Sequence, residues 1–132
     1  MSLGLWQDRP AAEVVRTAQA ADALGYGEIW IGEMATFDAF ALGAVVAERT
    51  SRASLTIGPL AVAVRDPVMI AMGAASLTEL TGRTVNVALG SSSPVVVEQW
   101  HGRRQERTAL ALAESAAAVR ALQSCGASFA YV

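Results

Sequence analysis

The sequence is poor in the residues that build disulfides and metal centres, with one cysteine and one histidine. It also has no lysine. The lone Cys125 cannot form an internal disulfide, which suits a reducing, cytoplasmic setting. With so few Cys and His residues, no cluster has the spacing of metal ligands, and we expect no metal site. An unreactive thiol is the simplest interpretation of Cys125, because no histidine lies near it in the sequence.

The sequence also has no strong excess of one sign of charge and no long apolar run. The net charge is −2 and residues of both signs are scattered, so no basic stripe indicates a nucleic-acid partner. The longest apolar run, 55–64, is far shorter than the ~20 residues that a membrane helix needs. No basic stretch followed by an apolar segment opens the chain, so we expect neither a signal peptide nor a membrane partner.

Apolar residues are abundant instead. They make up 53% of the 132 residues, and the mean hydropathy is +0.37. A chain of this length fits one domain. Such high hydropathy indicates strands buried on both faces, as in parallel sheets, or an apolar surface that meets a partner.

Strand-like and helix-like periodicities alternate along the chain. Turn and cap signals separate them, among them Pro10, Gly25 and Asp66-Pro67. We expect strands at 3–6, 28–32, 54–60 and 84–89, helices at 11–24, 38–49, 67–80, 94–100 and 107–122, and a further extended segment at 126–132. Trp30 is expected in the core, and Leu42, Val45 and Val46 are expected to face inward.

The alternation of strands and helices predicts an α/β fold with a parallel sheet and right-handed crossovers. Two architectures fit it. One is a (β/α)8 barrel of the TIM type, of which residues 1–132 would form the first four units and a single domain. The other is an open, doubly wound parallel sheet.

The segment 56–67 interrupts this regularity. Gly58-Pro59 falls within a run of residues that otherwise matches an interior strand. Because proline donates no ladder hydrogen bond, the pair marks either a bulge or the end of a short strand. We predict a bulge between Gly58 and Val62, with a cis peptide bond, because the Gly-Pro pair falls within an otherwise buried strand. Bulges often adjoin active sites.

Several motifs in order resemble the luciferase-like flavin and deazaflavin oxidoreductases, and more narrowly the branch that uses the deazaflavin coenzyme F420. The helix-to-strand segment 20–33 ends in Trp-x-x-Glu, and the third unit carries Arg65-Asp66-Pro67 and Thr81-Gly82-Arg83. The segment 89–102, LGSSSPVVVEQWHG, matches the fourth unit. The resemblance covers about residues 3–124. The sequence departs from the family pattern at Met34, Thr81 and Gln99, and it stops where a fifth unit should begin.

The resemblance implies a hydride transfer between the deazaflavin and an organic substrate, with FMN as the alternative cofactor. It implies that a bulge after the third strand, with a non-proline cis peptide bond at Leu60-Ala61 or beside it, supports the cofactor ring. It also implies that the loop after the fourth strand contacts the cofactor. The cofactor-binding residues would be Asp38, Pro59, Leu60, Ala61, Gly90, Ser91, Ser92 and Ser93, and Glu33 and His101 would be catalytic. A truncated half-barrel that acts through assembly is the other alternative, and we expect a homodimer.

Each of these residues also has a structural interpretation. Glu33 either acts on a substrate or forms a loop salt bridge, and Asp38 either contacts the site or caps a helix. The amides of the Gly90–Ser93 loop either bind an anion or precede a helix that Ser93 caps. His101 either donates a proton or packs beside Trp100. Arg83 precedes a strand at the stability face of a barrel, so we expect it to form a structural ion pair rather than to act in catalysis.

Overall fold

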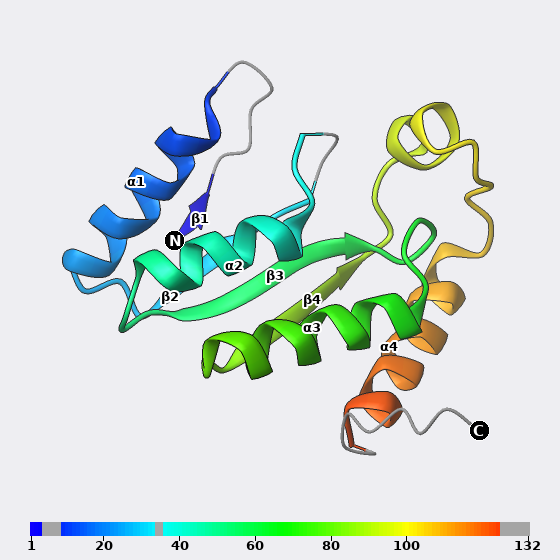
Figure 1. Ribbon diagram of the computed structural model, residues 1–132. Helices are drawn as coiled ribbons and strands as arrows, with labels where there is room; N and C mark the ends of the chain where they lie inside the picture. The colour runs from blue at the N-terminus through cyan, green and yellow to red at the C-terminus, as the bar shows by residue number, and fades with distance from the viewer. Residues whose placement is uncertain (4–8, 34–35, 125–132) are drawn as a thin grey trace.

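Four strands and their helices form the molecule (Figure 1), and the computed structural model describes residues 1–3, 9–33 and 36–124. The predicted element order is confirmed. The elements are β1 (Ser2–Leu3), α1 (Ala11–Ala23), β2 (Glu28–Ile31), α2 (Ala39–Arg49), β3 (Ser54–Ala61), α3 (Pro67–Thr81), β4 (Val85–Gly90), a short π-helical segment η1 (Val95–Trp100) and α4 (Thr108–Ser124). The expected segment at 126–132, Cys125, Met34 and most of the strand expected at 3–6 lie outside the described residues.

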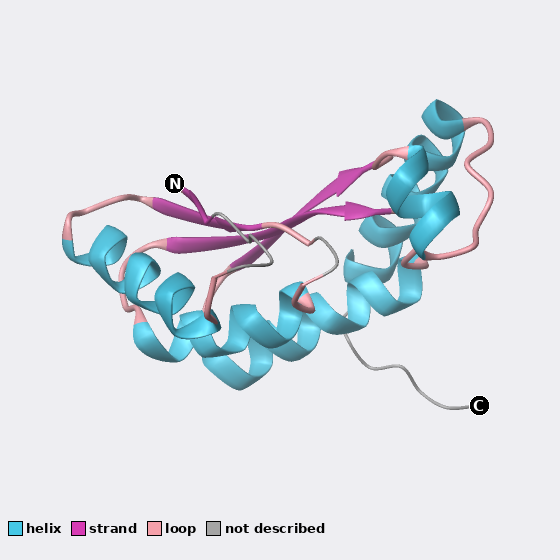
Figure 2. Ribbon diagram, turned by 90° about the horizontal axis from the view of Figure 1, so that it is seen from above, coloured by secondary structure: helices cyan, strands magenta, loops and turns pink. Residues whose placement is uncertain are grey.

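The strands form one parallel sheet in the order β1-β2-β3-β4. Figure 2 shows α1, α2 and α3 on one side of this sheet, and no helix of the described residues covers the other side. A doubly wound sheet would carry helices on both faces, so that alternative is wrong. Sequential parallel strands covered on one face are part of a β/α barrel.

The core lies between the sheet and these helices. Alternate strand residues face it, and Ile29, Ile31, Leu55 and Ile57 are fully buried. Trp30 lies on the opposite, open face and is 37% exposed, so its assignment to the core was wrong. Its indole donates to Glu28 rather than packing in the core.

Capping residues fix where the helices begin and end. Asp38 accepts a hydrogen bond from the Ala41 amide at 2.9 Å and starts α2. Asp66 caps α3 in the same way, with Pro67 in the first turn, and Gly82 ends it with a φ of 65°. On α2, Leu42 and Val46 are buried as expected. Val45 is 47% exposed, so its inward assignment was wrong.

The bulge predicted within β3 is confirmed. The register against β4 shifts between Ile57 and Leu60. In the described part of the chain the cis peptide bond is Gly58-Pro59, so the non-proline cis bond implied at or beside Leu60-Ala61 was wrong. Gly58 has a φ of 131°, and a Cβ there would overlap the Ala88 carbonyl oxygen. The bulge therefore needs glycine at this position.

Arg83 lies at the amino-terminal ends of the strands, where it connects the residues before β4 to the turn between α2 and β3. Its guanidinium donates to the carbonyl oxygens of Ala47, Thr50 and Ala53, at 2.8 Å in the case of Thr50. It therefore caps the C-terminus of α2 and fixes the turn into β3. Arg83 thus has a structural position, but the ion pair expected for it was wrong, because its described partners are backbone carbonyls and the Thr50 hydroxyl.

Candidate functional site at the carboxyl ends of the strands

The carboxyl ends of β2, β3 and β4 meet at one rim of the sheet, because the strands are parallel. Glu33 and Asp38 follow β2, Leu60 and Ala61 end β3, and Ser91 to Ser93 follow β4. These residues therefore share one end of the sheet. Active sites of barrel enzymes lie at this end.

Arg65 is the centre of this rim. Its Nε donates to Glu33 Oε2 at 2.6 Å and its Nη2 to Glu33 Oε1 at 2.5 Å, a bidentate pair between two loops. Nη2 also donates to Asp38 Oδ2. The guanidinium carbon lies 5.4 Å from the centroid of the Phe40 ring, within the range of a cation–π contact. Arg65 therefore ties the loop after β3 to the loop after β2 and to the start of α2.

Both carboxylates also bind backbone amides. Glu33 Oε1 accepts from the Ala39 amide at 3.2 Å, in addition to the pair with Arg65. Partial burial opposes ionisation of Asp38, but the Ala41 amide and the Arg65 guanidinium outweigh it and lower the pKa of Asp38. Hydrogen bonding to Glu33 outweighs the burial of Arg65 and raises the pKa of the guanidinium further above its ordinary value. The salt bridge and the helix cap considered for Glu33 and Asp38 are thus both present.

A cavity of about 340 Å³ opens beside this cluster. It takes side chains from the loops after β2 and β3 and from the segment around η1. Its lining is Glu33, Thr36, Phe37, Asp38, Ala61, Val64, Arg65, Val96 and His101. This volume is within the range of small-molecule sites. A few charged groups in a partly apolar wall are also typical of such sites.

The structure brings only some of the predicted site residues into this lining, namely Glu33, Asp38, Ala61 and His101. Leu60 is fully buried against the core, so only its backbone is available to a ligand. Pro59 is exposed and lies beside Gly90, where an added Cβ would approach the Pro59 Cβ to 3.1 Å. Pro59 and Gly90 thus form a low, side-chain-poor surface next to the cavity.

The loop after β4 uses its carbonyls and one hydroxyl internally. Gln105 Nε2 donates to the Ser91 and Ser92 carbonyl oxygens at 2.8 and 3.0 Å. Ser93 Oγ accepts from the Val96 amide at 3.4 Å, so the expected capping contact is present. Ser92 has a φ of 61°, and no described hydrogen bond is donated by its amide or by that of Ser91. These two amides are the groups of the loop that suit an anion.

Sequence reasoning missed Arg65 and Gln105. Arg65 was noticed as part of a motif, without a role. The signal that could have found it is its position as a lone cation between the end of a strand and the Asp66-Pro67 helix start. Among the described residues, no group of three or more His, Cys, Asp or Glu could hold a metal ion. Within the same residues, every helix is too short or too polar to cross a membrane.

The sheet and the position of the cavity define a β/α-barrel protein with its site at the carboxyl ends of the strands. Residues 3–129 match the luciferase-like monooxygenase family. The chain belongs to this family, as its motifs suggested.

Two curated relatives are similar to most of the chain. One, from Mycobacterium tuberculosis, is provisionally named a coenzyme F420-dependent oxidoreductase and is 31% identical over 104 residues, which cover 79% of this chain and 30% of the relative. The other is 4-hydroxyprotoasukamycin monooxygenase from Streptomyces nodosus subsp. asukaensis, 32% identical over 99 residues, or 69% of this chain and 24% of the relative. The matched region therefore spans about a third or less of each relative.

Solved structures share the fold. Monooxygenase RslO1 from Streptomyces bottropensis has a TM-score of 0.75 and 22% identity, over 87% of this chain and 38% of that one. The oxygenating constituent of 3,6-diketocamphane monooxygenase from Pseudomonas putida, solved with FMN, has a TM-score of 0.69 and 17% identity, over 85% of this chain and 35% of that one.

Proposed function

We propose that this chain forms the cofactor-binding part of an oxidoreductase that transfers a hydride between coenzyme F420 and an organic substrate. The observation that carries the proposal is the β3 bulge, which lies beside the cavity of about 340 Å³ at the carboxyl ends of the strands. The relative named as F420-dependent supports the deazaflavin as the cofactor.

The residues at this rim fit such a cofactor. Pro59 and Gly90 leave a low surface on which a flat ring can lie, because a Cβ at Gly90 would meet Pro59 at 3.1 Å. The backbone of Leu60 and the side chain of Ala61 continue that surface into the cavity. The amides of Ser91 and Ser92 point to the place where the negatively charged side chain of the cofactor would bind.

When bound, the deazaflavin supplies the hydride chemistry. The protein would hold the ring at the bulge, exclude water from the cavity and position the substrate. Glu33 would keep Arg65 in place, and Arg65 would order the loops after β2 and β3. His101, in the cavity lining, would donate a proton to the substrate.

An FMN-dependent monooxygenase is the second candidate. The curated monooxygenase relative favours it, and the same fold occurs in a structure solved with FMN. The third candidate is a non-catalytic half-barrel that acts by assembling with another chain.

Titration of the chain with F420 and with FMN, followed by cofactor fluorescence, separates these candidates. We expect tighter binding of F420, and at least tenfold weaker binding by Gly90→Val, whose side chain would fill the surface beside Pro59. Gly27→Ala is the matched control, because a Cβ at Gly27 meets nothing within 4 Å. Tighter binding of FMN would favour the monooxygenase, and no binding of either cofactor would favour the assembly role.

A further inference from the structure

The charges of the cavity do not balance. Among the described residues of its lining, three side chains are formally charged, namely Glu33, Asp38 and Arg65. The two carboxylates and the one guanidinium sum to a net charge of −1, before any proton on His101 is counted. The single cation is also already engaged, because Nε and Nη2 of Arg65 donate to the two carboxylates.

The excess negative charge lies on the accessible side of the cluster. The side chains of Glu33 and Arg65 are 16% and 17% exposed, whereas that of Asp38 is 49% exposed. Asp38 stays ionised at neutral pH, because the Ala41 amide and Arg65 outweigh its burial and keep its pKa below the ordinary value. A ligand in the cavity therefore meets the Asp38 carboxylate more readily than the Arg65 guanidinium.

The rest of the wall is mostly apolar. Phe37, Ala61, Val64 and Val96 line the cavity together with the charged cluster. Such a wall favours the apolar body of a small organic molecule, and the cluster decides which polar group that body carries.

We infer that this cavity is selective by charge, and that it takes a compact organic molecule with an uncharged or cationic head group and rejects carboxylates and phosphate esters of the same shape. The inference gives the substrate class of the proposed oxidoreductase and rests on that function only in treating the cavity as the substrate chamber. It also places the anionic part of the cofactor away from Asp38, toward the amides of the loop after β4.

Three probes of nearly identical shape test this selectivity: benzamidine, benzamide and benzoate. Their dissociation constants, measured by amide chemical-shift titration of the chain at low ionic strength, are expected to rise in that order. The shifts should concentrate on Ala61, Arg65 and His101 rather than on the groove between α3 and α4, which Ala74 and Leu122 line.

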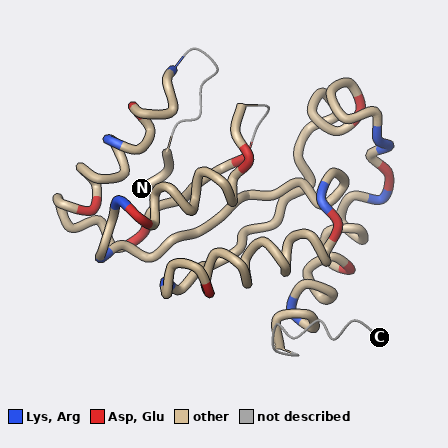
Figure 3. Tube along the Cα trace, in the orientation of Figure 1, with Lys and Arg blue, Asp and Glu red and all other residues tan. Residues whose placement is uncertain are grey.

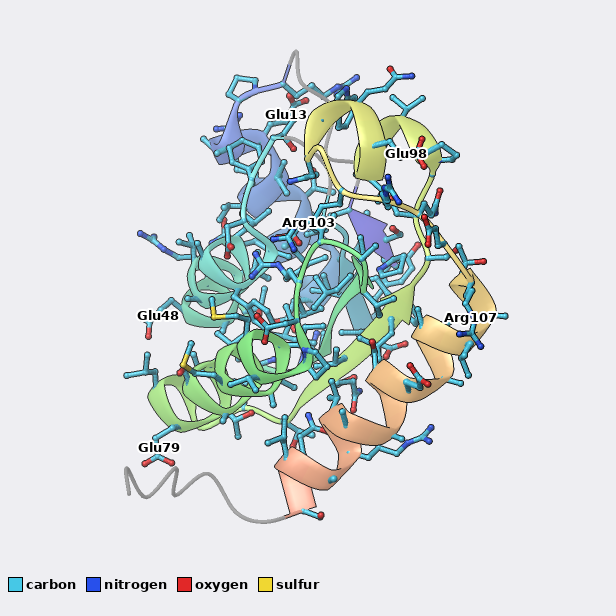
Figure 4. The ribbon with its side chains drawn as sticks, turned by 90° about the vertical axis from the view of Figure 1, so that its right-hand side faces the viewer. Glu13, Glu48, Glu79, Glu98, Arg103 and Arg107 are labelled. Carbon is cyan, nitrogen blue, oxygen red and sulfur yellow. The ribbon has the colours of Figure 1, made fainter. Side chains whose placement is uncertain are left out.

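Asp38→Asn removes the excess charge and retains the capping ability of the residue, because asparagine caps helices as well as aspartate does. We expect it to reduce the preference for benzamidine over benzoate by about fivefold, an effect that added salt also reduces. Glu48→Gln is the matched control. It changes the net charge by the same amount on the same helix, and Figure 4 shows Glu48 projecting outward from α2.

Three outcomes would overturn the inference. They are equal or tighter binding of benzoate, an effect of Asp38→Asn no larger than that of Glu48→Gln, and shifts outside the cavity or none at all. Because no cofactor is added, these results are independent of whether the chain binds F420.

Discussion

At the scale of single residues, the rim depends on Arg65, which holds two carboxylates from a neighbouring loop and helix start. Without the guanidinium, Glu33 and Asp38 would face each other with no cation between them. We expect Arg65→Met to lower the free energy of unfolding by about 2–3 kcal/mol, less than for a fully buried pair because Asp38 is half exposed.

Urea unfolding measures this loss. Adding Glu33→Gln to Arg65→Met should restore part of it, since one unpaired charge is then removed. Additive losses in the double variant would show that the pair is not coupled.

The contacts of Asp22 lead to a prediction of how the free energy of unfolding depends on pH. Its carboxylate accepts from the amides of Ala53, Ser51 and Arg52, at 2.8, 2.9 and 3.0 Å. The Ala53 and Ser51 amides, opposed by burial, lower the pKa of Asp22 from 3.8 to about 2. Because the folded pKa is the lower one, the stabilisation is complete above the unfolded pKa near 4 and is lost as the pH falls toward 2.

Unfolding midpoints in urea between pH 5 and pH 2 measure this loss. Asp22→Asn should remove the part of the acid destabilisation that arises between pH 4 and pH 2. An unchanged pH profile in that variant would contradict the assignment.

At the scale of elements, the bulge in β3 depends on Gly58. Alanine there would meet the Ala88 carbonyl oxygen and would have to adopt a φ of 131°. We expect Gly58→Ala to destabilise the fold by at least about 2 kcal/mol, while Gly27→Ala at an open position changes little. Thermal unfolding followed by circular dichroism compares the two, and equal effects would mean that the bulge tolerates a side chain.

The boundaries of most elements were predictable because local chemistry sets them. Asp38, Asp66-Pro67 and Gly82 start or stop helices through contacts within a few residues. The Arg65–Glu33 pair was not predictable in the same way, because its partners are 32 residues apart in sequence and meet only through the parallel register. Trp30 was misassigned because a barrel strand has two apolar-looking faces, and here only one of them is covered.

At the scale of the whole molecule, β1 and β4 are the edge strands of the sheet, and within residues 1–3, 9–33 and 36–124 no helix covers one of its faces (Figures 1 and 2). Acidic and basic residues are interspersed along the described backbone (Figure 3). Exposed parallel edges and apolar helix faces favour association with another chain. We therefore expect this chain by itself to dimerise or aggregate and to bind the coenzyme only weakly. Multi-angle light scattering that gave a single monomeric mass, together with micromolar binding, would contradict this expectation.

The central claim is that the carboxyl-end rim of the sheet is the deazaflavin site. Two-dimensional amide NMR of the chain during titration with coenzyme F420 tests it most directly, because it detects weak binding and locates it. We predict shifts at Ala61, Gly90, Ser91 and Ser92, with little change at Gly27, Gly82 and Arg83 on the opposite rim. Shifts confined to the opposite rim, or no shifts with excess coenzyme, would contradict the claim.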